Sequence, residues 1–131
     1  MIQAIDHIGI AVADLDEALA AWSRLGLDRP VIEDVPEQGV RVAMLPVGGG
    51  KIELLAPLSP DSPVGRFLER RGPGLHHVAL RVDDIEAALA EAEARGLELI
   101  DRQPRIGAGG ARIAFVHPRS TGGTLVEFCQ R

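Results

Sequence analysis

The sequence is poor in the residues that mark several common classes of protein. It has a single cysteine, Cys129, and no tyrosine, and aromatic residues make up only 3% of its 131 residues. One cysteine cannot form an intrachain disulfide, so nothing in the chain indicates secretion. No apolar run approaches the roughly 20 residues of a membrane span, and no signal-peptide pattern precedes Ile5. These absences predict a cytoplasmic protein.

The charge balance narrows the possible partners. The formal net charge is -5, which argues against nucleic acid and against anionic membranes as partners. An anionic small molecule remains possible where arginines cluster locally. With 46% hydrophobic and 25% charged residues, the composition is that of an ordinary globular protein. The length fits one domain, or two half-domains that share a core.

The most informative feature is a repeat with an offset of 70 residues. The segment DHIGIAVADLDEA at 6–18 returns as HHVALRVDDIEAA at 76–88. Each copy continues to a matching glycine, Gly26 or Gly96. A histidine occupies the same place in both copies, at His7 and His77. A repeat of this length predicts two similar modules with pseudo-two-fold symmetry and a metal-capable site between them.

Hydrophobic periodicity predicts the same order of elements in both halves. The first half is expected to contain a strand at 5–13, a helix from 15 to 25, and strands at 31–35, 40–46 and 51–56. A linker at 58–62 and a short helix at 65–71 follow. The second half is expected to contain a strand at 75–82, a helix at 84–95, and strands at 97–101, 111–117 and 124–129. The pattern predicts one α+β domain over 1–131, with βαβββ modules at 3–57 and 74–131 joined by 58–73.

The paired histidines lie on the less apolar face of their strands. Alternation places His7 on the same side as Gly9 and Ala11, which are too small to fill a core. His77 takes the equivalent position, and His76 must point the opposite way. A lone strand histidine is more often structural than a ligand. Recurrence at equivalent repeat positions favours metal ligation instead.

Each half also ends in a strand with one acid between apolar residues, Glu53 and Glu127. Such a glutamate is costly to bury unless it is paired or bound to a cation, and the alternative is an edge-strand acid that faces solvent. Recurrence in both halves favours the site. Two imidazoles and two carboxylates suit a divalent transition metal that keeps open positions for a substrate.

Other residues carry weaker signals. Arg105, Arg112 and Arg119 lie in or near the long loops of the second half and are either contacts for an anionic substrate or solvated surface residues. His117 is expected to be structural or to lie at the rim of the site. Cys129 is expected to be a small core residue and not a nucleophile. The loop 117–123 is longer than its counterpart in the first half.

Taken together, these motifs resemble the vicinal-oxygen-chelate (glyoxalase/bleomycin-resistance) superfamily and, within it, the methylmalonyl-CoA epimerase family. The matching segments are IDHIGIA at 5–11, EQGV at 37–40, IELLAPL at 52–58, SPV at 62–64, GLHH at 74–77, PRIG at 104–107 and HPRSTGG at 117–123. They extend along nearly the whole chain in the family's order. The resemblance implies tandem modules that form a curved mixed sheet around a metal.

The resemblance also implies a chemistry. The metal ligands would be His7, Glu53, His77 and Glu127, and the ion would be divalent: cobalt first, or manganese, nickel, iron or zinc. The reaction would be epimerisation at C2 of methylmalonyl-CoA through a metal-chelated enolate. Some family members carry a further glutamate, proposed as a base, where this chain has Val42, so Glu53 and Glu127 become the expected acid–base pair. Arg105, Arg119 and Ser120 would contact the substrate, and the protein would be a homodimer.

Two other functions fit the same fold. Glyoxalase I uses two histidines and two glutamates as well, but the HPRSTGG loop and the 58–74 connection fit an epimerase better. A drug-sequestering protein of the bleomycin-resistance type usually lines its cleft with aromatic residues, which this chain largely lacks. The sequence leaves open whether the modules pair within one chain or across a dimer.

Overall fold

The computed structural model describes residues 1–131 and forms two compact units. One unit contains residues 7–76, and the other contains residues 1–6 together with 77–131. The boundaries between them therefore fall inside two strands. None of the helices has both the length and the apolar character that crossing a membrane requires.

The unit of residues 7–76 holds a four-stranded mixed sheet and two helices. Its elements are β1 (Ile2–Ala11, of which 7–11 belong here), α1 (Leu15–Ser23), β2 (Val31–Val35), β3 (Val40–Val47), β4 (Gly50–Pro57) and α2 (Pro63–Arg71). The strand order is β2-β3-β4-β1. Neighbouring strands are antiparallel except β1, which runs parallel to β4. A short 3-10 turn, Pro36–Gln38, joins β2 to β3.

The second unit repeats this arrangement. Its elements are β5 (Gly74–Val82, of which 77–82 belong here), α3 (Ile85–Ala94), β6 (Arg105–Ile106), β7 (Arg112–Val116) and β8 (Val126–Gln130). The strand order is β5-β8-β7-β6, and β5 runs parallel to β8. The expected α+β class and the βαβββ order of each half are confirmed.

Equivalent residues begin and end the first helix of each half. The carboxylate of Asp14 accepts the amide of Glu17 at 3.0 Å, and that of Asp84 accepts the amide of Ala87 at 3.1 Å. Both contacts satisfy an N–H group that the first turn leaves without an intrahelical partner. Past each helix, Gly26 and Gly96 adopt φ values of 97° and 88°, which favour glycine and let the chain turn away.

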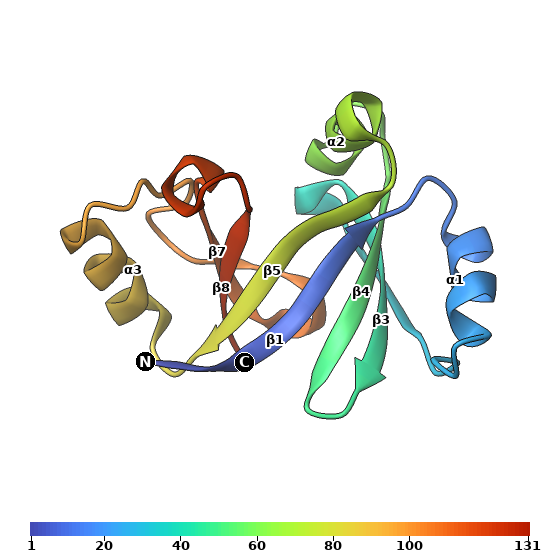
Figure 1. Cartoon of the computed structure of the whole chain (residues 1–131), viewed down its shortest axis with the longest axis horizontal. Coiled ribbons are helices and arrows are strands. Elements are labelled where there is room, and N and C mark those ends of the chain that lie inside the picture. Colours follow the sequence, from blue (N-terminus) through green and yellow to red (C-terminus); the bar gives the residue numbers. More distant parts are fainter. The chain divides into compact units, whose positions relative to one another are not determined.

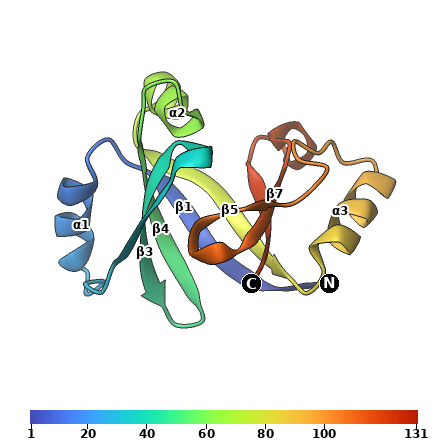
Figure 2. The same cartoon turned by 180° about the vertical axis from the view of Figure 1, so that it is seen from behind.

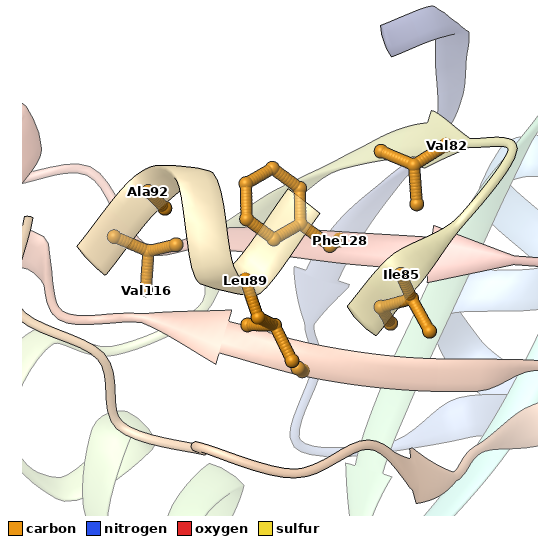
Figure 3. Packing of buried hydrophobic residues seen from close by; sticks show 7 residues of the cluster. Val82, Ile85, Leu89, Ala92, Val116 and Phe128 are labelled. Carbon is orange, nitrogen blue, oxygen red and sulfur yellow. The ribbon is translucent and has the colours of Figure 1, made fainter. Parts of the chain in front are cut away.

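Each unit has its own hydrophobic core between a helix and its sheet. Helix α1 packs against β4 (Figures 1 and 2), and the core beneath it centres on Leu15, Leu45 and Leu54. Helix α3 packs against β7 and β8, where Ile85 and Leu89 meet Phe128 and Val116 (Figure 3).

The strand predicted over 97–101 is wrong. The amides of Ile100 and Asp101 both donate to the carbonyl of Phe115, at 2.9 and 3.2 Å. In a regular antiparallel ladder only alternate residues bond to the partner strand, so two successive amides on one carbonyl interrupt the ladder. The short strand β6 lies beside β7 instead, four residues further along the chain.

Candidate metal centre

His7 and Glu53 form a buried pair in the unit of residues 7–76. His7 lies on β1 and Glu53 on β4, and both residues are only 4% exposed. The His7 Nδ1 atom is 3.4 Å from Glu53 Oε2. In the parallel ladder Glu53 stands opposite Gly9, two residues beyond His7.

His77 and Glu127 form the corresponding pair in the second unit. They lie on β5 and β8 and are 6% and 3% exposed. The His77 Nε2 atom is 3.5 Å from Glu127 Oε1. Glu127 stands opposite Ala79, again two residues beyond the histidine.

The two pairs thus follow one construction. In each, a glutamate on an inner strand faces a small residue on the parallel neighbour, and the histidine precedes that small residue by two. Because strand residues i and i+2 share a face, the small residue leaves room beside the histidine. The edge-strand alternative for the two acids is excluded, since β4 and β8 each have a partner on both sides.

The donor atoms suit a divalent metal. An ionised carboxylate is costly to bury unless a cation or a proton compensates it, and the Oε2 atoms of Glu53 and Glu127 are both hidden from solvent. Each carboxylate has an imidazole nitrogen beside one of its oxygens, Oε2 of Glu53 and Oε1 of Glu127, and carboxylate oxygen with imidazole nitrogen is a donor set used by transition metals. Each unit therefore contains two side chains that could bind such a metal.

Aromatic and charged residues surround His77. The ring of Phe115 on β7 meets the imidazole edge to face at 5.5 Å between centroids, with an interplanar angle of 88°. The guanidinium of Arg105 lies 6.0 Å from the centroid of the same ring. Asp101 accepts the amide of Phe115 at 2.9 Å and pairs with Arg105 at 3.1 Å. Sequence reasoning missed Phe115 and Asp101, because neither belongs to a recurring motif.

His76 has different surroundings. Its ring meets that of Phe67 on α2, with centroids 4.9 Å apart, and burial lowers the pKa of the imidazole. Desolvation disfavours the charged form, so His76 tends to stay neutral. The opposite orientations expected for His76 and His77 fit these different contacts.

The loop 117–123 is tied to the segment before β6. The Ser120 hydroxyl accepts the amide of Glu98 at 2.7 Å, and Arg119 donates to the Glu98 carboxylate at 3.3 Å. The His117 Nδ1 atom accepts the amide of Arg119 at 3.0 Å, inside a 3-10 turn, Pro118–Thr121. The structure thus brings Arg119 and Ser120 together at Glu98, while Arg105 is held by Asp101. Arg112 pairs with Glu86.

Asp6 was not anticipated as a structural residue. It is fully buried, and its carboxylate accepts from Arg81 at 2.9 Å and from Arg131 at 2.7 Å. Cys129 is also fully buried, and burial raises the pKa of its thiol to about 12. The expectation that Cys129 is a core residue is confirmed.

Val42, at the position of a proposed base in some epimerases, is 2% exposed on β3. Its side chain has no proton to exchange.

Comparison with known proteins decides the family. A profile described as the glyoxalase/bleomycin resistance protein/dioxygenase superfamily matches residues 6–115. This chain belongs to that superfamily. The resemblance stated from the sequence is confirmed as well, because superfamily members named methylmalonyl-CoA epimerase match nearly the whole chain.

Three of these superfamily members illustrate the similarity. An ethylmalonyl-CoA/methylmalonyl-CoA epimerase from Cereibacter sphaeroides is 42% identical, with 99% of both chains covered. The mitochondrial methylmalonyl-CoA epimerase of Homo sapiens is 38% identical over 96% of this chain and 73% of its own. The solved structure of a methylmalonyl-CoA epimerase in complex with methylmalonyl-CoA and NH4+ has a TM-score of 0.96 at 36% identity, covering 99% of this chain and 95% of its own.

Proposed function

We propose that this chain is a metal-dependent isomerase that interconverts the two epimers at C2 of methylmalonyl-CoA. The observation that carries the proposal is the pair of matching buried His–Glu sites in a chain whose relatives are named epimerases of this substrate. No specific observation favours either of the alternatives considered from the sequence, glyoxalase I or a drug-sequestering protein.

The metal would be held by His7, Glu53, His77 and Glu127. One buried His–Glu pair comes from each unit, and the donor atoms of these residues suit a divalent transition metal, with cobalt the first candidate. When bound, such an ion supplies positive charge to the substrate's carbonyl oxygen atoms and makes the C2 hydrogen more acidic.

Glu53 and Glu127 would also move the proton at C2. Reversal of configuration requires that a proton leave from one face and return to the other, so a group that can exchange a proton is needed on each side of the substrate. These acids come from different halves of the chain, and Val42 offers no third candidate. His7 and His77 would orient the carboxylates beside them.

The remaining contacts are also proposals. Arg105 and Arg119 would bind anionic parts of the substrate, with Ser120 beside Arg119. Both arginines already hold carboxylate partners, Asp101 and Glu98, which a phosphate would have to displace. A homodimer stays a prediction.

A solvent-exchange assay tests the function directly. Methylmalonyl-CoA is incubated in deuterium oxide with the protein, with and without a chelator, and deuterium at C2 is measured. We expect rapid exchange that the chelator abolishes and added cobalt restores. Exchange that persists without metal, or turnover of the glutathione hemithioacetal of methylglyoxal in place of methylmalonyl-CoA, would overturn the proposal. The same assay with ethylmalonyl-CoA shows whether the protein also accepts a larger acyl group.

A further inference from the structure

Helix α2 concentrates positive charge that the protein itself does not neutralise. Eight arginines form ion pairs with carboxylates elsewhere in the structure: Arg41, Arg81, Arg95, Arg102, Arg105, Arg112, Arg119 and Arg131. Of the five that form none, three lie within six residues on α2: Arg66, Arg70 and Arg71. The chain as a whole is acidic, so this is a local reversal of its charge.

All three arginines are exposed on the surface of the helix. Arg66 and Arg70 are four residues apart, as are Phe67 and Arg71, so all four residues lie on neighbouring positions of the helix surface. The Arg71 guanidinium carbon lies 5.9 Å from the centroid of the Phe67 ring. The buried side of α2 carries Val64 and Gly65 instead.

This arrangement is unfavourable for the helix on its own. Like charges four residues apart repel each other. Arg66 also lies in the first turn, where the helix dipole disfavours a cation, although the dipole favours Arg70 and Arg71 in the last turn. An external anion would relieve the repulsion, and guanidinium groups match phosphate oxygens in pairs.

We propose that the arginine face of α2, formed by Arg66, Arg70 and Arg71, binds the phosphate groups of the coenzyme A part of the substrate. This inference rests on the proposed function. Helix α2 packs against β4, which carries Glu53, and lies beyond the C-terminal end of that strand (Figure 1). The acyl end and the phosphate end of the substrate would thus meet residues of the same unit. A phosphate here displaces no carboxylate, unlike at Arg105 or Arg119.

The test separates the phosphate groups from the rest of the substrate. The triple variant Arg66→Gln, Arg70→Gln, Arg71→Gln is compared with wild type, both as the full cobalt-loaded chain, on methylmalonyl-CoA and on methylmalonyl-pantetheine, which lacks the nucleotide. We expect the KM for the CoA ester to rise about tenfold with kcat unchanged, and the KM for the pantetheine ester to stay the same. The wild-type KM for the CoA ester should rise with salt, and that of the variant should rise less steeply.

The matched control is the double variant Arg24→Gln, Arg29→Gln, which removes the other two arginines that lack carboxylate partners. It should leave both KM values unchanged. Calorimetric titration with free CoA gives an affinity that does not depend on turnover, so loss of that affinity in the triple variant would support the inference even if the epimerase assay failed. An unchanged affinity and KM in a triple variant with the wild-type melting temperature would overturn it. An equal rise in KM for both esters would overturn it as well.

Discussion

The ring of Phe115 meets the imidazole of His77 edge to face, with their centroids 5.5 Å apart. This contact fixes one side of a side chain that we propose as a metal ligand. Residues that orient a ligand's ring tune its affinity for the metal without touching the ion. If His77 binds the metal, Phe115 is therefore a positioning residue.

Replacing Phe115 with leucine should weaken cobalt binding by about three- to tenfold, since an edge-to-face aromatic contact contributes about 0.5–1.5 kcal/mol. Competition with a chromophoric chelator gives the affinity. The nuclear magnetic resonance signals of the His77 ring protons in the metal-free protein should also shift as the ring current of Phe115 is lost. Phe67→Leu is the control, because that ring meets His76. Equal loss of affinity in both variants would contradict a specific role.

The neighbouring histidines His76 and His77 allow a sharper test of ligation. His77→Ala should lower the affinity for cobalt at least about 100-fold, more than loss of a residue that only orients a ligand. His76→Ala should leave that affinity close to wild type, because His76 packs against Phe67. The measurement is the same chelator competition. Two equal affinities would remove His77 from the ligand set.

Glu127→Gln should lower turnover of methylmalonyl-CoA at least about 100-fold, since the amide cannot exchange a proton at C2. Metal content, measured by mass spectrometry of the purified protein, should fall as well. Glu91→Gln, on the exposed side of α3 beside Arg95, provides a matched control with full activity. Unchanged turnover and metal content in Glu127→Gln would remove this residue from both proposed roles.

Asp6→Asn should destabilise the fold without acting on the chemistry directly. Its buried carboxylate accepts from Arg81 and Arg131, and the amide would leave both guanidinium groups poorly compensated. We expect a loss of about 2–3 kcal/mol in the free energy of unfolding, less than for a fully buried pair because the two arginines stay partly exposed to solvent. Urea denaturation measures this. Asp34→Asn, which breaks an exposed pair with Arg41, should barely move the unfolding midpoint.

The sequence predicted best those features of the structure that occur in both copies of the repeat. Two copies of one pattern identified the βαβββ order, and the same comparison selected His7, Glu53, His77 and Glu127, which are all buried in the structure. A repeat strengthens the prediction because each of its two copies indicates the same local fold independently.

Features that depend on single long-range contacts were missed. The partners of Asp6 are 75 and 125 residues away in sequence, so nothing near Asp6 indicates its ion pairs. The expected strand at 97–101 failed because hydrogen bonds to Phe115, and not local β-propensity, decide how that segment meets β7. The pairing of Arg119 with Glu98, 21 residues away, likewise appears only in three dimensions.

The two halves pair their inner strands in the same way, β1 with β4 and β5 with β8, but their outer strands β2 and β6 differ. β2 has five residues and β6 only two, yet Glu53 and Glu127 hold the same register against β1 and β5. The strands that carry the proposed ligands therefore keep their register although the strands at the edge of each sheet differ in length. For protein engineering, the substrate preference could therefore be changed without altering the proposed metal site. Loops and strands at the periphery can be rebuilt to admit a different acyl group, while β1, β4, β5 and β8 are left as they stand.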